Sequence, residues 1–133
     1  MADTSIEPVY LFDLAASEAR WLAVRQAVVA ENVANANTPG YAAKDVAPFD
    51  SVYQQTSLQL ATDNPRQIGN DPLDVESAAG KDEQPWEVTL SGNSVSMEHE
   101  MLKANEVSRM YAMNTGIVKA FHQMMSLSLK SST

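Results

Sequence analysis

The stretch from about residue 11 to residue 35 carries apolar side chains around most of the circumference of a helix. One face repeats at spacings of three and four residues, as an α-helix requires, and consists of Phe12, Ala16, Ala19, Ala23, Ala27, Ala30 and Ala34. A row of larger side chains lies beside it: Leu11, Ala15, Leu22, Val29 and Val33. A helix this apolar needs cover on more than one side, and its alanines allow another backbone to approach closely.

A second long helix is expected from about residue 97 to residue 129. Ser96 is suited to cap its N-terminus, and Glu98 and Glu100 place negative charge in the first turn, where unpaired N–H groups favour it. Its apolar positions follow helical spacing: Met97, Met101, Ala104, Val107, Tyr111, Val118, Phe121, Met125 and Leu129. The two ends of the chain therefore predict helices of roughly 37 and 50 Å, at about 1.5 Å per residue.

The segment between the helices, residues 38–95, holds five of the six prolines and four of the five glycines. These residues interrupt long helices and central strands. We expect a short edge strand or extended arm over residues 42–49, a strand over residues 86–90 and a polar loop over residues 54–84.

The expected fold is mainly α, with the two terminal helices forming a coiled coil and an extended middle segment that carries short β strands. Residues 1–37 and 96–133 are expected to supply the two helices of the coiled-coil domain, and residues 38–95 the corner, arm, loop and short β hairpin. About 1.5 kcal/mol of ordering cost per residue makes a lone helix pair marginal. The remaining apolar faces are therefore predicted to contact other chains, although a self-contained bundle covered by the middle segment is the alternative. The predicted packing residues are Ala16, Ala19, Leu22, Ala23, Ala27, Val29, Ala30, Val33, Ala34, Met101, Ala104, Val107, Tyr111, Val118, Phe121 and Met125.

Composition excludes several classes of function. The chain has no cysteine, which rules out disulfides, thiolate zinc sites and cysteine nucleophiles. Its net charge of −8, from 9 basic and 17 acidic residues, provides no basic surface for nucleic acid. No apolar run reaches the roughly 18 residues of a membrane span, and the acidic start MADTSIEPVY lacks the pattern of a cleaved signal peptide. We therefore expect no nucleic-acid partner, no lipid span and no cleaved leader.

The most enzyme-like stretch is Glu98-His99-Glu100. A helical zinc site would need a second histidine four residues after His99, and that position is Lys103, whose charge would repel a metal ion. His122 would lie about 140° around an ideal helix from His99. The helix N-terminus explains both glutamates, and the sequence contains no nucleophile-elbow or phosphate-loop motif. We therefore expect no enzyme, no metal site and no cofactor.

The first helix is expected to end in a tight corner. Asn35 and Asn37 suit a helix end, because asparagine tolerates a left-handed backbone and can bond the last carbonyl groups. Pro39 cannot continue a helix, and Pro39-Gly40 fits the central pair of a type II turn. The chain then reverses, and Tyr41 begins the arm.

The string NVANANTPGY, residues 32–41, resembles the N-terminal signature of the rod and hook family of bacterial flagellar axial proteins. Its corner motif consists of Asn32, Asn35, Asn37, Thr38, Pro39, Gly40 and Tyr41. The string VSMEHEMLK, residues 95–103, resembles the opening of the C-terminal helix in the proximal rod members of this family. The short length agrees, because the distal rod and hook members insert large middle domains. The resemblance covers roughly residues 10–50 and 90–130.

The resemblance implies a structural subunit of the flagellar basal-body rod. In this family the terminal helices form a coiled coil around a central export channel, and the rod transmits motor torque to the hook. The subunits leave through the flagellar type III export apparatus without a cleaved signal peptide and assemble in the periplasm. The implied partners are copies of the same subunit, FlgC-like and distal rod proteins, a FliE-like adaptor and the MS ring.

Two other classes remain open at this stage. An acidic helical export chaperone or adaptor would share the acidity and the long helices, but not the arm that follows the Thr-Pro-Gly-Tyr corner. A small cell-wall hydrolase would need a pair of acids placed for catalysis, and the sequence shows no such pair.

Overall fold

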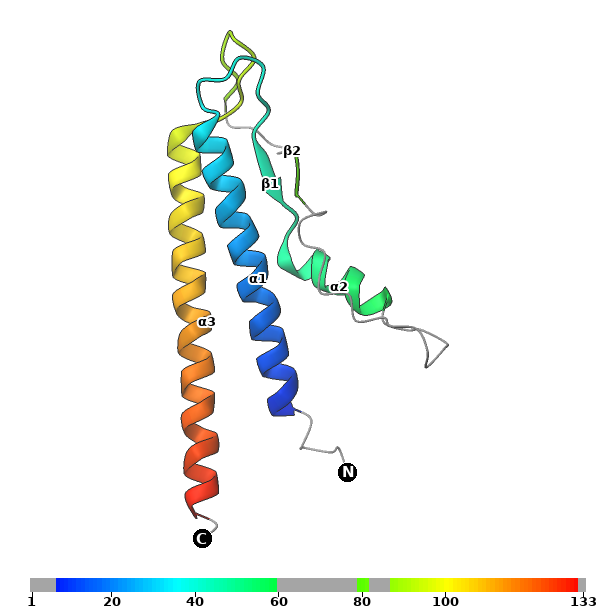
Figure 1. Cartoon of the computed structure of the whole chain (residues 1–133), viewed down its shortest axis with the longest axis vertical. Coiled ribbons are helices and arrows are strands. Elements are labelled where there is room, and N and C mark those ends of the chain that lie inside the picture. Colours follow the sequence, from blue (N-terminus) through cyan, green and yellow to red (C-terminus); the bar gives the residue numbers. More distant parts are fainter. Residues whose placement is uncertain (1–6, 60–78, 82–86, 132–133) are drawn as a thin grey trace.

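Two long helices dominate the computed structural model, which describes residues 7–59, 79–81 and 87–131 (Figure 1). The described elements, in chain order, are α1 Glu7–Ala34, β1 Lys44–Val46, α2 Phe49–Gln59, β2 Ala79–Lys81 and α3 Met97–Ser131. The strands pair antiparallel, with Lys44 opposite Lys81 and Val46 opposite Ala79. The prediction of a mainly helical fold with long terminal helices is confirmed.

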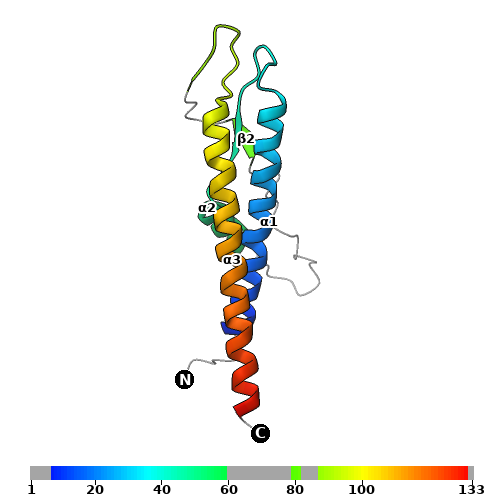
Figure 2. The ribbon, with the colours of Figure 1, turned by 90° about the vertical axis from the view of Figure 1, so that its left-hand side faces the viewer.

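Helices α1 and α3 run antiparallel, with the end of α1 beside the start of α3 in both views (Figures 1 and 2). Leu22 and Val107 are buried where the helices meet. Further along, the side-chain amide of Asn114 donates to the carbonyl of Ala15 at 2.9 Å. A buried amide at such a position fixes the register of two helices. That the pair supercoils as a coiled coil stays a prediction.

The helix boundaries follow local chemistry. Helix α1 begins at Glu7, before the expected start, because Pro8 is tolerated in a first turn where no N–H is needed. It ends at Ala34, after which the amide of Asn35 bonds to the Glu31 carbonyl at 3.1 Å. Helix α3 begins at Met97, and the Ser96 hydroxyl accepts from the amide of His99 at 3.4 Å, as expected of an N-cap.

The middle segment differs from the prediction in three places. Strand β1 lies within the expected arm, but its partner β2 lies in the expected loop, so the two strands do not form a tight hairpin. Helix α2 also occupies part of that loop, because the run that follows Pro48 contains no further proline or glycine before residue 60. The predicted strand over residues 86–90 is wrong for residues 87–90, where Val88 and Leu90 are exposed and no buried face favours a strand. Trp86 and residues 60–78 and 82–84 of the expected loop lie outside the described residues.

A small core forms where the arm and α2 fold back onto α1. It consists of Trp21, Leu22, Val28, Val46, Val52 and Val107. The indole N–H of Trp21 donates to the carbonyl of Ala47 at 2.9 Å, and the ring lies 6.0 Å from that of Phe49. The middle segment therefore covers one side of α1. The alternative of a self-contained bundle expected such cover from this segment. Many large apolar side chains nevertheless stay exposed, among them Met101, Leu102, Tyr111, Met113, Ile117, Met124, Leu127 and Leu129.

Leu22 and Val33 provide a test of this core. Leu22 is 1% exposed and Val33 is 39% exposed. We expect Leu22→Ala to lower the free energy of unfolding by about 2–5 kcal/mol, because it leaves a cavity. Val33→Ala removes atoms that are already hydrated in the free chain, so its cost should stay below about 1 kcal/mol. Urea unfolding followed by circular dichroism measures both, and equal costs would contradict the placement of Leu22 in the core.

Candidate functional site

The alanines of α1 form an open band on the surface, which we call the alanine stripe: Ala16, Ala19, Ala23, Ala27, Ala30 and Ala34. All of them are exposed except Ala19, which is half-buried. At about 1.5 Å per residue the stripe is roughly 27 Å long. No described part of the chain covers it, so it is available to another molecule.

The other predicted packing residues of α1 have different environments. Leu22 and Val29 are buried within the chain, so they stabilise the subunit itself. Val33 lies near the end of the helix and is partly exposed. In the row of large side chains, Leu22 and Val29 therefore pack inside the subunit, while Val33 is exposed.

The predicted packing residues of α3 also divide into two groups. Val107 is buried, and Ala104, Val118 and Phe121 are half-buried. The ring of Phe121 meets that of Phe12 edge-on, with centroids 5.6 Å apart. The exposed members are Met101, Tyr111 and Met125.

A cluster of charged side chains ties the arm to both long helices. Asp45 on β1 is its centre: its carboxylate lies 3.4 Å from Arg25 Nε of α1 and 3.1 Å from Lys103 Nζ of α3. Arg25 also reaches Glu106 at 3.2 Å, and Lys103 reaches Glu100 at 3.6 Å. Sequence reasoning placed Glu100 at a solvated helix start and did not single out Asp45. The charge pair Glu100 and Lys103, spaced three residues apart, was the signal available for this cluster.

Asn32 holds the arm against the end of α1. Its side chain is fully buried, and its amide donates to the carbonyl of Lys44 at 2.7 Å while its oxygen accepts from the N–H of Lys44 at 2.9 Å. The hydroxyl of Tyr41 donates to the same oxygen at 3.3 Å. The side chain of Asn32 therefore pairs with β1 as a neighbouring strand would.

The corner itself has the predicted geometry. The amide of Tyr41 donates to the carbonyl of Thr38 at 3.2 Å, and Gly40 between them has a φ of 72°. A type II turn requires this positive φ at its third residue, and glycine adopts it without strain. The side-chain amide of Asn35 donates to the Glu31 carbonyl at 2.9 Å, and its side-chain oxygen accepts from the Thr38 hydroxyl at 3.2 Å.

A second loop, residues 88–95, completes the corner. Asn93 is 2% exposed, and its side-chain amide donates to the carbonyls of Asn35 at 2.9 Å and Thr38 at 2.7 Å. The amide of Gly40 bonds to the Ser91 carbonyl at 2.9 Å. Sequence reasoning expected only a turn here, because nothing local indicates that Asn93 caps a distant helix end. The loop that precedes α3 is therefore bonded to the end of α1 and to the corner that follows it.

Glu31 and Lys44 add an ion pair outside this network. Their side chains approach to 2.6 Å, so the ammonium group holds the pKa of Glu31 below its ordinary value. The pair therefore stabilises the folded chain above the unfolded pKa of this carboxyl, and the contribution is lost as the pH falls through the folded pKa. Both side chains are more than a third exposed, which keeps this contribution small.

Comparison with known proteins decides the family. A family model described as "Flagella basal body rod protein" matches residues 19–41. A protein of Agrobacterium fabrum named "Flagellar basal body rod protein FlgB" is 45% identical over 132 residues, which cover 96% of this chain and 98% of that protein. The chain belongs to the FlgB family of flagellar rod proteins.

The FlgB family consists of structural rod proteins, so this chain is a rod protein of the flagellar basal body and associates with other rod components. Of the classes that the sequence left open, the comparisons support the structural rod subunit. The residues matched by the family model hold five of the six members of the alanine stripe and the whole corner motif.

The described residues of this FlgB-family chain bring together no group of three histidine, aspartate or glutamate side chains that could hold a metal ion. None of the described helices is long and apolar enough to cross a bilayer.

Asn32 and Asn37 test the corner network, because Asn32 is buried and Asn37 is exposed. Asn32→Ala leaves both polar groups of Lys44 without this partner, at a cost of about 1–3 kcal/mol per buried unsatisfied group. We expect the arm to detach and the emission of Trp21 to shift to the red, measured with Trp86→Phe so that Trp21 is the single tryptophan. Asn37→Ala is the matched control and should change neither the emission nor the stability. An unchanged emission in Asn32→Ala would refute the role of this side chain.

Proposed function

We propose that this chain is a subunit of the proximal rod that transmits motor torque to the hook and lines the axial export channel. Helices α1 and α3, from residues 1–37 and 96–133, would form the axial part, with the corner, arm and α2 of residues 38–95 lying outward. The observation that carries the proposal is the apolar surface of these helices, which residues 7–59, 79–81 and 87–131 leave uncovered.

Helix α3 offers this surface on two sides. Met97, Met101, Ala104, Ser108 and Tyr111 recur at spacings of four and three residues, so they share one face. A second row repeats in the same way and consists of Met113, Ile117, Ala120, Met124 and Leu127. Alternate spacings of three and four are those of a helix–helix seam. The large members of both rows are exposed, which is unusual for a soluble monomer and typical of an interaction surface.

The alanine stripe of α1 suits close contact with a neighbouring helix. Helix axes pack about 8–10 Å apart, and the smallest side chains allow the shortest distances. Close spacing increases the number of van der Waals contacts along the whole helix, and each pair of atoms contributes only about 0.1–0.2 kcal/mol. Many such contacts repeated from subunit to subunit would make a stiff tube.

The corner network supports the transmission of torque. Asn32, Asn93 and Asp45 connect α1, the arm and the start of α3 through buried or half-buried polar contacts. Twisting one helix against the other at this end would break several of these contacts together. A load applied to one helix would therefore pass to the other without bending the joint.

The proposed partners are copies of this subunit, FlgC-like and distal rod proteins, a FliE-like adaptor and the MS ring. The proposed location is the periplasmic rod, reached through the flagellar type III export apparatus. Membership of the FlgB family supports these assignments.

Ala23 tests the packing claim, because it is exposed and lies in the middle of the alanine stripe. Ala23→Leu should leave the isolated subunit unchanged by circular dichroism but hold neighbouring helices apart, at a cost of about 1–3 kcal/mol in each copy. We expect loss of swimming and of rods in isolated basal bodies. Ala23→Ser keeps the side chain small and is the matched control, so it should remain motile. Normal swimming of cells that carry only Ala23→Leu would contradict a packed alanine stripe.

A further inference from the structure

The methionines of this chain are concentrated on one helix. Six of the seven lie on α3: Met97, Met101, Met110, Met113, Met124 and Met125. Methionine ordinarily fills gaps inside a core, and Met110 does so, since it packs against the core cluster. The other five are exposed, and the exposed fractions of Met101, Met113 and Met124 are 63%, 59% and 59%. Core packing therefore does not explain the thioethers that lie in solvent.

These exposed thioethers lie within the two apolar rows of α3. Met101 belongs to the first row, and Met113 and Met124 belong to the second. The proposed function assigns both rows to contacts with neighbouring subunits. A thioether is apolar enough to pack in such a contact, whereas its oxidised form, the sulfoxide, is polar.

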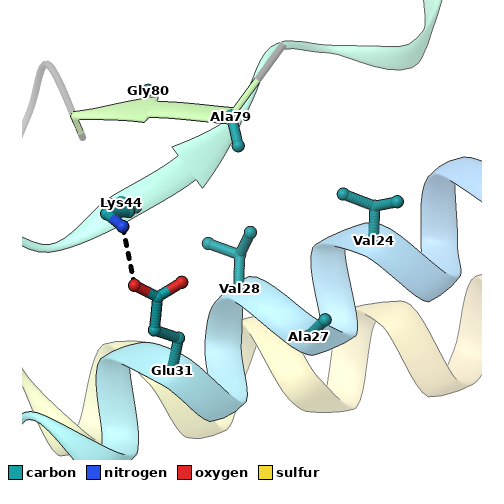
Figure 3. A pocket seen from close by; sticks show the side chains of 7 residues that line it. All are labelled: Val24, Ala27, Val28, Glu31, Lys44, Ala79 and Gly80. Carbon is teal, nitrogen blue, oxygen red and sulfur yellow. Dashed lines mark hydrogen bonds and ion pairs between the residues drawn. The ribbon is translucent and has the colours of Figure 1, made fainter. Parts of the chain in front are cut away.

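The open surface of α1 offers no comparable group. Its alanine stripe holds only methyl side chains, and a groove of about 400 Å³ between α1 and the sheet is lined by Val24, Ala27, Val28, Glu31, Lys44, Ala79 and Gly80 (Figure 3). None of these side chains contains sulfur, and the chain has no cysteine whose thiolate would compete for an oxidant. Among the described residues, the thioethers that a peroxide can oxidise therefore all lie on α3.

We propose that Met101, Met113 and Met124 are oxidation sites, and that their conversion to sulfoxide by a peroxide keeps the subunit out of the rod. The inference rests on the proposed function, because it needs the rows of α3 to be covered in the rod. The sulfur attacks one oxygen of hydrogen peroxide, so an S–O bond forms as the O–O bond breaks. The departing hydroxide takes the proton of the transferred oxygen and leaves as water. Sulfur loses two electrons to the peroxide, and methionine sulfoxide reductases reverse the change.

The sulfoxide is expected to act on assembly and not on the isolated fold. In the free subunit its oxygen is hydrated, because these three side chains lie in solvent. In a helix seam the oxygen would be buried against apolar side chains that donate no hydrogen bond, which is unfavourable. Met110 lies against the core, so the fold shields the one thioether of α3 whose oxidation would disturb internal packing. Exposure thus directs the oxidant to positions where the change affects contacts between subunits.

Mass spectrometry of the purified full chain tests the assignment of the sites. The chain would be exposed to hydrogen peroxide and digested, and the sulfoxide fraction at each methionine followed with time. We expect Met101, Met113 and Met124 to be converted severalfold faster than Met110, because susceptibility follows exposure. The circular dichroism spectrum should stay unchanged. Equal rates at Met110 and at the three sites would overturn the inference.

Two double variants test the effect on assembly in cells that lack the natural chain. Met113→Gln with Met124→Gln introduces unbranched polar side chains that resemble the sulfoxide, while Met113→Leu with Met124→Leu keeps the row apolar and cannot be oxidised. We expect the glutamine pair to lose most rods, counted in isolated basal bodies, and the leucine pair to build them in the natural number. Thr115→Gln, at an exposed position outside both rows, controls for glutamine itself and should also build rods.

Each further outcome has one meaning. Rods built in the natural number by the glutamine pair would overturn the inference and leave the proposed function standing. Loss of rods in the leucine pair would also overturn the inference, because polarity would then not be what excludes the subunit. Absence of the natural chain from isolated rods would overturn the proposed function itself.

Discussion

Helix α1 has apolar surface on three sides, and the described residues of the chain supply cover for two of them. Asn114 of α3 bonds to the carbonyl of Ala15, and Trp21 bonds to the carbonyl of Ala47, so α3 covers one side of α1 and the arm with α2 covers another. The third side is the alanine stripe, which stays open to solvent along most of the helix. Burial of apolar surface is the dominant favourable contribution to folding and association, so an uncovered side of this length leaves the subunit incomplete by itself. The proposed function assigns the missing cover to neighbouring rod subunits.

The corner decides how the covered sides are held together. The apolar core of the described residues is small, with six buried side chains in its cluster, and polar contacts hold the arm in place beside it. Asn32 replaces a β-strand partner, Asn93 binds the end of α1, and Asp45 lies between cations from both long helices. Buried polar groups are costly unless they are fully paired, so these contacts specify one arrangement of the arm rather than adding much stability. These polar contacts therefore hold α1, the arm and the start of α3 in one arrangement at one end of the helix pair.

Local patterns in the sequence predicted the elements that local chemistry determines. The periodicity of α1 and α3, the cap at Ser96 and the turn at Gly40 each depend on residues within a few positions, and the structure confirms them. Helix α2, strand β2 and the loop over residues 87–90 were missed, because short segments rich in polar residues adopt the conformation that their packing selects. The burial of Lys103 and Asn114 was missed for a related reason, since their partners Asp45 and Ala15 are remote in sequence. The alanine stripe was identified as a surface, but the identity of its neighbours is encoded in other chains.

The most direct test of this account is a map of the assembled basal body in which each rod subunit is resolved. The account predicts that the alanine stripe and the exposed rows of α3 lie within about 4–4.5 Å of apolar atoms from neighbouring chains. It also predicts that the arm, α2 and the core residue Trp21 keep the contacts that they have in the single chain. A map in which Ala16, Ala23 and Ala30 face solvent, with no neighbouring chain against them, would contradict the central claim that the uncovered side of α1 is completed by other subunits.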